Sequence, residues 1–454
     1  MRASRRNFLQ TCVAAPLLAG CALPPAGDSA MPPVIFVHGN GDTAALWLTT
    51  LWRFESNGWP RDRLFAPDLP YPGARSDDSK AQPGRSSSAE NTQALAAEIG
   101  RVRRLTGAAQ VVLVGNSRGG YAIRDLIHMR SQAGGPQEVS HAVLCGVPNH
   151  GVWAGSFNPG SEFNGSSPFL AALNAPRGAA GLEVDPGVRF MTLRSDGLDK
   201  YAQPDGRWIG QPNLATNVDS NGPALNGAQN QVLPGRDHRE TAFHPGAFAA
   251  MWRFLTGRTP VHLAVAAEGT VMLDGRITGF LGADPTNLPL AGARLEVFAT
   301  DPATGLRKGA AVHQRTVGED GRYGPFAAQP GQPLEFVIHA PGLAVTHIYR
   351  AAFPRSTAIL HMRPAAWNTA EDSAGSVLVY TRPRGYLATG RDAMRFDGAA
   401  PPGIGAGVPG ISVARIRLPD VPDRPVIAEL NGERIVMRAW PARERHVSFA
   451  EFHY

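Results

Sequence analysis

A serine flanked by glycines follows a short apolar run in this chain, and no other feature restricts the fold as strongly. The apolar run is residues 111–114 (VVLV), and the pentapeptide GNSRG comes next. Residues 120–127 then have the amphipathic pattern of a helix. In a strand, tight turn and helix of this kind, the serine hydroxyl projects out of the sheet from a strained turn. The pattern predicts an α/β domain with a doubly wound, mostly parallel sheet, and it makes Ser117 the candidate nucleophile.

A serine becomes nucleophilic when a neighbouring base takes its proton and a third group orients that base. The base is the easier partner to find. His238 lies between the apolar run at residues 230–233 and a helical pattern at residues 245–255. A histidine after the last strand fits the chain order of serine, acid and histidine. His238 is therefore the candidate base.

The acid has more than one candidate. Asp196 and Asp199 both follow the apolar run at residues 187–193, and Asp205 lies a little further on. All three lie between the serine and the histidine, as the chain order requires. A carboxylate that does not contact the base is expected to hydrogen-bond the backbone in its loop, which is a common role for Asp in turns.

The negative oxygen that forms when a serine attacks a carbonyl needs two fixed N–H donors. One donor is expected from the backbone of Arg118, directly after the serine. The other is expected from the backbone of Asn40, in the loop HGN that follows the apolar run at residues 34–37. An ordinary strand-to-helix turn is the alternative interpretation of this loop, and it suits His38 equally well.

Residues 34–257 resemble the α/β-hydrolases, and among them the bacterial and archaeal lipases. Four segments carry the resemblance: HGNG (38–41), GNSRGG (115–120), GVPNHG (146–151) and SPFLAALN (167–174). The resemblance implies a serine carboxylester hydrolase that works through an acyl-enzyme and uses no cofactor. Related enzymes usually place the acid a few residues beyond the strand end, which implies Asp199 rather than Asp196.

Two residues depart from the lipase pattern, which usually has His before the serine and Met after it. Here the two positions hold Asn116 and Arg118. If the cation of Arg118 faced the cleft, it would favour carboxylate-bearing or polymeric substrates. The interpretation that we favour is a salt bridge on the helix that follows the serine.

Residues 1–30 resemble an export signal with a lipobox and a short linker. The segment SRRNFLQ is close to the twin-arginine motif, and the apolar stretch 12–18 is too short to span a bilayer permanently. The segment LAGC resembles a bacterial lipobox, which implies acylation of Cys21 and a lipid anchor in the membrane. The residue after Cys21 is not Asp, which favours the outer membrane. Cleavage near Ala26 would instead release a soluble secreted enzyme.

Cysteine content and charge argue against several other classes of protein. Of the three cysteines, Cys12 and Cys21 fall in the signal, which leaves Cys145 without a partner for an intramolecular disulfide. No Cys/His spacing is typical of zinc, and no glycine-rich loop has a nucleotide-binding pattern. The net charge of +6 includes three arginines of the signal, and the other basic residues are scattered. No metal, cofactor or nucleic-acid partner is expected, and the oligomeric state stays open.

The length of 454 residues and a change of pattern near residue 259 predict more than one domain. We expect the catalytic domain at residues 31–258. Short alternating runs follow, the first at residues 261–265, with turns rich in Gly, Pro and Asp, which indicates an all-β sandwich or barrel. This part comprises residues 259–365, and residues 366–454 form either a second lobe or the remainder of the same β-domain.

A short lid region is expected at residues 151–186. It is rich in Gly, Ser, Asn and Pro and contains one small apolar helix, residues 168–173, so a large cap is not expected. Trp153, Phe157 and Phe163 lie in this region. They form either an apolar rim for acyl chains or ordinary packing of the lid.

Lipid esters are the leading substrate class for an enzyme of this kind. The alternative is an extracytoplasmic depolymerase of aliphatic polyesters of the polyhydroxyalkanoate type, in which the β-rich part would grip the polymer. A third hypothesis, a non-catalytic surface-anchored binding protein, is disfavoured because Ser117, Asp199 and His238 occur in the order that catalysis requires.

Overall fold

The computed structural model describes residues 31–454 except residues 203–206, 209–210 and 216–220. The export signal, the lipobox with Cys21 and the alternative acid Asp205 lie outside the described residues. Among the residues that are described, no helix combines the length and the apolar character needed to cross a membrane.

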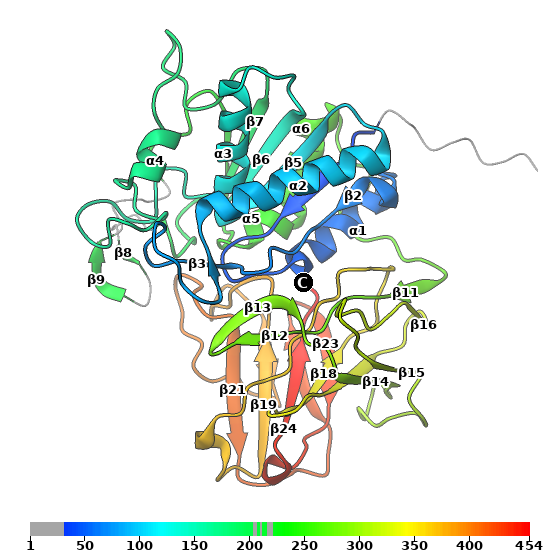
Figure 1. The fold of residues 1–454 in the computed structure, drawn as a ribbon. Coiled ribbons are helices and arrows are strands. Elements are labelled where there is room, and N and C mark those ends of the chain that lie inside the picture. Colours follow the sequence, from blue (N-terminus) through cyan, green and yellow to red (C-terminus); the bar gives the residue numbers. More distant parts are fainter. Residues whose placement is uncertain (1–30, 203–206, 209–210, 216–220) are drawn as a thin grey trace, which may run out of the picture. The chain divides into compact units, whose positions relative to one another are not determined.

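A parallel sheet of six strands forms the centre of the first half of the chain (Figure 1). The strand order is β10-β7-β6-β5-β1-β2, and every neighbouring pair is parallel. The strands are β1 (Val34–Val37), β2 (Leu64–Phe65), β5 (Val111–Asn116), β6 (Val139–Cys145), β7 (Arg189–Ser195) and β10 (Gln229–Leu233). Helices cover both faces, so the central strands β1, β5 and β6 are largely apolar and buried. The expected α/β fold is confirmed.

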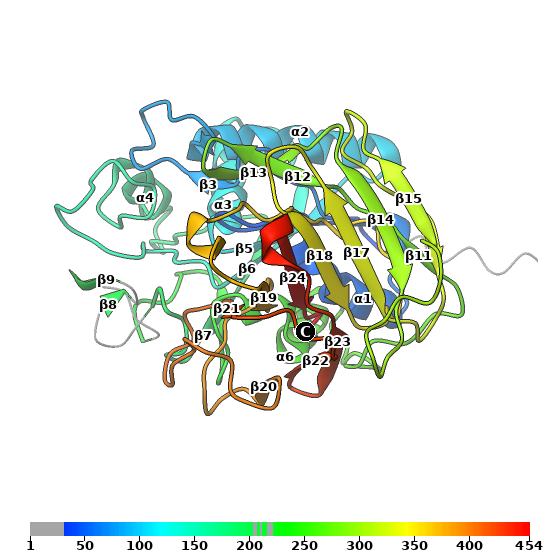
Figure 2. The same cartoon turned by 90° about the horizontal axis from the view of Figure 1, so that it is seen from below.

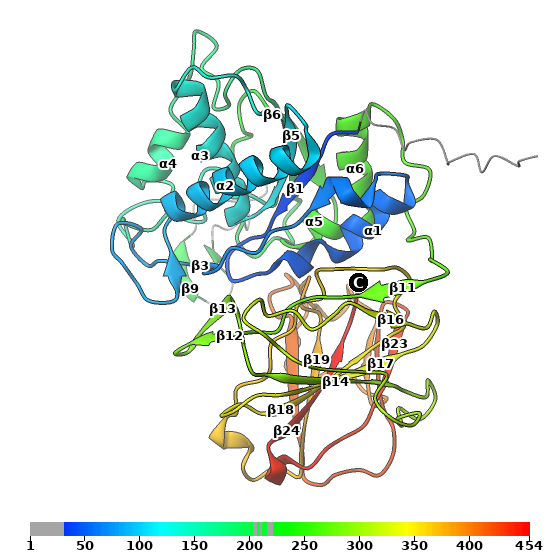
Figure 3. The ribbon, with the colours of Figure 1, turned by 45° about the vertical axis from the view of Figure 1, so that its right-hand side comes forward.

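Helices pack on the two faces of this sheet in two pairs, as Figure 3 shows. On one face lie α2 (Ser88–Thr106) and α3 (Arg118–Gln132), and on the other lie α1 (Leu48–Ser56) and α6 (Pro245–Thr256). The start of α2 is fixed by a capping box, in which the side chains of Ser87 and Glu90 bond each other's backbone N–H.

Shorter elements connect these helices and strands. The lid region contains α4 (Pro168–Leu173), which coincides with the small helix expected from the sequence. The others are α5 (Glu240–Phe243), the 3-10 turns η1 (Ala44–Trp47) and η2 (Arg61–Arg63), and the two-stranded sheets β3 (Gly73–Ala74) with β4 (Arg85–Ser86) and β8 (Arg207–Trp208) with β9 (Gln211–Ala215).

Residues 259–454, called the β-region below, are rich in strands, as expected. The largest sheet has seven strands in the order β15-β14-β17-β18-β24-β19-β21, and Figure 2 shows β18, β17 and β14 side by side. These strands are β14 (Arg294–Ala299), β15 (His313–Thr316), β17 (Leu334–His339), β18 (Val345–Arg350), β19 (Ser376–Thr381), β21 (Val413–Leu418) and β24 (His446–Glu451). Because β24 pairs in parallel with both β18 and β19, the segments before and after residue 366 share one sheet.

Smaller sheets complete the β-region. A three-stranded sheet faces part of the large one, and Tyr380 and Leu430 belong to the core between them. The remaining elements are β11 (Val271–Leu273) with β16 (Phe326–Ala328), β12 (Thr278–Leu281) with β13 (Asp284–Pro289), β20 (Met394–Phe396) with β22 (Val426–Leu430) and β23 (Glu433–Met437), and the 3-10 turns η3 (Thr369–Glu371) and η4 (Ala442–Glu444).

The prediction of a strand at residues 261–265 is wrong. Val261 is 80% exposed, and side chains at the C-terminal end of α1 and directly after it, rather than a neighbouring strand, bond the backbone here. Asn57 Nδ2 donates to the carbonyl of His262 at 2.9 Å, and Arg53 Nε donates to the carbonyl of Leu263 at 3.0 Å. The alternating pattern of residues 261–265 therefore belongs to a connection without strand structure, which contacts the end of α1.

The helix α1 also joins the first half of the chain to the core of the β-region. The indole N–H of Trp52 donates to the carbonyl of Ser356 at 2.9 Å. Its ring lies 6.4 Å from that of Phe353, edge to face, among buried side chains of the β-region. Residues 32–454 accordingly form one compact unit.

Candidate active site

The turn at Ser117 has the strained backbone that its sequence setting predicts. Ser117 lies between β5 and α3 with φ 51° and ψ −123°, a conformation that non-glycine residues rarely adopt. Two residues later the chain passes very close to the end of β1. A Cβ at Gly119 would lie 2.6 Å from the carbonyl oxygens of Val37 and His38, so only glycine fits. This close approach fixes α3 against the sheet directly behind the serine.

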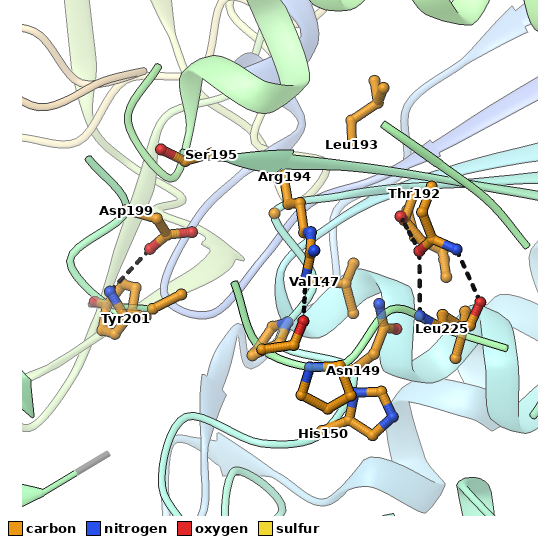
Figure 4. A pocket seen from close by; sticks show the side chains of 17 residues that line it. Val147, Asn149, His150, Thr192, Leu193, Arg194, Ser195, Asp199, Tyr201 and Leu225 are labelled. Atoms are coloured by element: carbon orange, nitrogen blue, oxygen red, sulfur yellow. Dashed lines mark hydrogen bonds between the residues drawn. The ribbon is translucent and has the colours of Figure 1, made fainter. Parts of the chain in front are cut away.

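The structure brings Asp199 and His238 together. Oδ2 of Asp199 lies 2.7 Å from Nδ1 of His238, and both side chains are buried. The other oxygen of Asp199 accepts the backbone N–H of Tyr201 at 2.8 Å, as Figure 4 shows. An ionised carboxylate only accepts hydrogen bonds, so in the neutral imidazole Nδ1 carries the proton and Nε2 is the basic nitrogen.

Asp196, the alternative acid, is placed differently. It is exposed, and its carboxylate accepts the backbone N–H of Gly235 at 3.0 Å. The expected bond to the backbone of its own loop is therefore replaced by a bond to another loop, 39 residues further along the chain.

Three neighbours hold the backbone of His238. Its carbonyl accepts hydrogen bonds from the hydroxyl of Thr241 at 2.7 Å and from the amide of Asn116 at 3.3 Å. The same amide donates to the carbonyl of Cys145 at 2.9 Å. Gly146 has φ 57°, and a Cβ there would lie 2.7 Å from the carbonyl oxygen of His238. Asn116, at a position where lipases usually have His, therefore supports the loop that carries His238.

Ser117 and His238 line one cavity of about 120 Å³. Asn40 also lines it, and its side-chain oxygen accepts the backbone N–H of Ala74 at 2.8 Å, which fixes the loop. Arg118 is the first residue of α3, so its backbone N–H belongs to the positive end of that helix. The full lining is Gly39, Asn40, Asp42, Asn116, Ser117, Val152, Trp153, Phe163, Tyr201, His238, Arg239 and Tyr386.

Family models match both halves of the chain. Residues 32–165 match the model for the alpha/beta hydrolase fold, and residues 269–366 match the model for a lipase C-terminal domain. The chain is an α/β-hydrolase with a C-terminal domain. No curated protein matches the hydrolase.

Several solved structures are similar to this hydrolase. Lipase B from Aspergillus fumigatus is 18% identical over 52% of this chain and 55% of that chain, with a TM-score of 0.34, so the match spans about half of the lipase. A carboxylesterase from Bacillus subtilis is 16% identical over 51% of this chain and 86% of that chain, with a TM-score of 0.28. A monoacylglycerol lipase from Paleococcus ferrophilus is 13% identical over 50% and 96%, with a TM-score of 0.33.

His38 holds the loop that carries Asn40. It is fully buried, and its Nε2 accepts the backbone N–H of Leu69 at 3.0 Å while Nδ1 lies 2.9 Å from the carbonyl of Gly39. Asn287 of β13 donates to the backbone carbonyl of Asp42 at 2.9 Å, so the β-region of the hydrolase reaches this loop. These contacts fit the alternative interpretation for His38, in which it has a structural role in the turn.

The cation of Arg118 does not face the cavity. Its guanidinium forms a two-pronged ion pair with Glu162, with Nη2 to Oε2 at 2.9 Å, and both side chains are almost fully buried. Burial raises the pKa of Glu162, and the charge of Arg118 opposes this shift. A salt bridge was expected, but its partner comes from the lid region rather than from α3. The pair therefore ties the lid to the helix that begins behind Ser117.

The aromatic residues of the lid region differ in position. Trp153 and Phe163 are packed together and line the cavity of the hydrolase. Phe157 is 53% exposed, and its backbone carbonyl accepts the indole N–H of Trp153 at 2.9 Å. Two of the three candidate rim residues thus lie at the cavity, and the third lies outside it.

Residues missed by the sequence analysis form the side of the cavity next to His238. The ring centroid of Tyr201 lies 4.7 Å from that of the His238 imidazole, edge to face. Nε of Arg239 lies 3.3 Å from Oδ2 of Asp42. Burial lowers the pKa of neighbouring Lys200 to about 8, and the charge of Arg239 adds to this effect. In the sequence, the only indication that Arg239 lies at the site was its position next to His238. No feature of the sequence indicated Tyr386.

A second, smaller cavity of about 50 Å³ is lined by Asp199 and Tyr201, among other residues (Figure 4). Asn230 bridges its wall, accepting from the hydroxyl of Thr192 at 2.8 Å and donating to the carbonyl of Leu225 at 2.9 Å. The first bond connects β7 with β10, and the second ties β10 to the segment that precedes it. In the described part of the chain, no three His, Cys, Asp or Glu side chains form a metal-binding group.

The buried pair predicts a large loss of stability when one partner is removed. Arg118→Met leaves the Glu162 carboxylate buried without its partner, and we expect the free energy of unfolding to fall by about 3–5 kcal/mol in urea denaturation. Adding Glu162→Gln should restore most of this loss. The matched control is Arg101→Met, which removes an exposed pair with Glu98 and should cost less than about 1 kcal/mol. Equal losses in the two single variants would contradict this account.

Proposed function

We propose that the hydrolase cleaves carboxylic esters through an acyl-enzyme on Ser117. The supporting observation is the 2.7 Å contact between Asp199 and His238 beside the cavity that Ser117 also lines. In this proposal His238 Nε2 takes the hydroxyl proton while Oγ of Ser117 attacks the ester carbonyl. His238 then gives that proton to the departing alcohol, and water, activated by the same nitrogen, releases the acid.

The other proposed roles are electrostatic. Asp199 holds the imidazole in the tautomer that leaves Nε2 basic, and it stabilises the imidazolium that forms during the attack. The backbone N–H groups of Asn40 and Arg118 donate to the oxygen of the tetrahedral intermediate. One donor of this kind contributes roughly 3–4 kcal/mol to the transition state.

We also propose that the preferred esters have short acyl groups. The cavity of about 120 Å³ is smaller than the apolar cavity of about 150 Å³ that holds one benzene molecule. Val152, Trp153 and Phe163 give it an apolar side. A long acyl chain would extend beyond this space or require the lid region to move, so long-chain lipid esters are a less direct fit than short esters.

For the place of action, we propose export by the twin-arginine route and anchoring to the cell envelope through Cys21. The sequence of residues 1–30 supports this proposal, since twin-arginine and lipobox patterns occur together there. A freely secreted enzyme, cut near Ala26, is the alternative.

Substitution of the three proposed catalytic residues tests the mechanism. Ser117→Ala should abolish turnover of p-nitrophenyl esters, and Asp199→Asn should lower kcat about 10⁴-fold because the imidazole loses its correct tautomer. Asp196→Asn is the matched control and should stay near the wild type. An active-site-directed phosphonate should label Ser117, as located by mass spectrometry. A folded wild type that neither turns over esters nor reacts with the phosphonate would point to a binding protein.

A series of p-nitrophenyl esters of increasing acyl length tests the substrate class. We expect kcat/KM to fall at least about tenfold between butanoate and palmitate, and Trp153→Ala to reduce this difference by enlarging the acyl space. A rise toward long chains would contradict the short-chain proposal and favour lipid esters. Clearing of a turbid polyester film would favour the depolymerase.

Labelling with a radioactive fatty acid in a bacterial host tests the anchor. Cys21→Ser should lose the label and move from the membrane fraction to the soluble fraction, whereas Cys12→Ser should behave as the wild type. A wild type that takes up no label and stays in the soluble fraction would favour the secreted enzyme, and a Cys21→Ser variant that stays in the membrane fraction would contradict anchoring through Cys21.

A further inference from the structure

One side of the active-site cavity comes from the β-region. Tyr386 lines the cavity together with His238 and Arg239. It lies between β19 and β20, outside the residues that match the lipase C-terminal domain model. The cavity beside the proposed nucleophile is therefore completed by a segment far along the chain.

Tyr386 is held through both its backbone and its ring. Its backbone N–H donates to Oδ2 of Asp237 at 2.9 Å. Nζ of Lys200 lies 4.2 Å from the ring centroid, and Cζ of Arg239 lies 5.1 Å from it. Only 6% of Tyr386 is exposed. A side chain fixed in this way has the rigidity that discrimination between substrates requires.

Four charged side chains, of which Arg391 is half-buried and the other three are buried, fix this segment against the loop that carries His238. Arg382 Nη2 donates to Glu240 Oε1 at 2.8 Å. Arg391 Nη1 lies 3.2 Å from Oδ2 of Asp237 and 3.0 Å from Oε2 of Glu240. Separation of the two segments would leave carboxylates buried without their cations, which is strongly unfavourable. The segment that carries Tyr386 is therefore fixed against the loop that carries His238, the proposed base.

The two sides of the cavity differ in chemistry. The side formed by the lid region is apolar (Val152, Trp153 and Phe163). The side next to His238 is formed by Tyr386 and Arg239. The hydroxyl of Tyr386 shares a hydrogen bond with Tyr201, and the guanidinium of Arg239 donates to the carbonyl of Pro383 at 2.7 Å. In acyl transfer the histidine gives its proton to the departing alcohol. The alcohol half of the ester consequently lies next to His238, against the polar side.

We propose that Tyr386 is a specificity-determining residue that selects esters whose alcohol carries a hydrogen-bonding group, either a hydroxyl or a carboxylate. This inference rests on the proposed function, because it assigns the alcohol subsite of the same reaction. A phenol hydroxyl donates or accepts, and the guanidinium of Arg239 donates to either group. A hydroxyl has one donor and two acceptor positions, so Tyr386 keeps bonding capacity for the alcohol beside its bond to Tyr201. An alcohol without a polar group cannot make this additional bond and is expected to be a poorer substrate.

The test varies the alcohol and keeps the acyl group constant. Butanoate esters of 1-propanol, glycerol and 3-hydroxypropanoate are compared for the wild type, Tyr386→Phe and Tyr386→Ala. The measured quantity is kcat/KM for each polar ester divided by kcat/KM for the propyl ester. We expect this ratio to fall about tenfold in Tyr386→Ala and by a smaller factor in Tyr386→Phe. A fall confined to the glycerol ester identifies a polyol subsite, and one confined to the hydroxypropanoate ester identifies a carboxylate subsite.

Tyr380→Phe is the matched control. Its hydroxyl donates to the carbonyl of Glu429 at 2.7 Å within the β-region, and it does not line the cavity, so its ratio should equal that of the wild type. An unchanged ratio in Tyr386→Ala overturns the proposal, and if that variant does not fold, an unchanged ratio in Tyr386→Phe does so. Failure of the proposed function is distinguishable, because Ser117→Ala would then turn over the esters as well as the wild type.

Discussion

The backbone turn at Ser117 is the constraint on which the rest of the structure depends. A serine with φ 51° persists only where its surroundings enforce that conformation. Here they consist of a buried strand before it, a helix after it, and the close contact of Gly119 with the end of β1. The turn determines where the hydroxyl lies, and the contacts of Asn116 and Gly146 hold the loop of His238 beside the same cavity.

Much of this frame could be predicted because local patterns determine it. β1 (Val34–Val37) and α4 coincide with the residues expected from the sequence, since a short apolar run and a Ser-Pro start are local signals. The contact between Asp199 and His238 was also expected, because the chain order of serine, acid and histidine places both residues after strands of one sheet, and the resemblance to related enzymes implied Asp199 rather than Asp196. The short strands of the β-region followed from alternation and from turn residues in the same way.

Contacts between distant segments could not be predicted. Glu162 has no local feature that pairs it with Arg118, and the pair forms only because the lid region folds back on α3. Tyr386 reaches the cavity through hydrogen bonds and ion pairs that cross from one half of the molecule to the other. Residues 261–265 alternate as a strand does, yet the side chains of Arg53 and Asn57, at the end of α1 and directly after it, bond their backbone instead. In each case the deciding partner is remote in sequence.

The place of β24 has a consequence for how the β-region is made. β18 and β19 are synthesised well before β24, yet in the finished sheet β24 lies between them and pairs with both. Until residues 446–451 emerge, each of the two earlier strands presents an open edge to the cell. Ribosome-bound or truncated chains are thus the species most exposed to aggregation, and chaperone protection matters most at that late stage of translation.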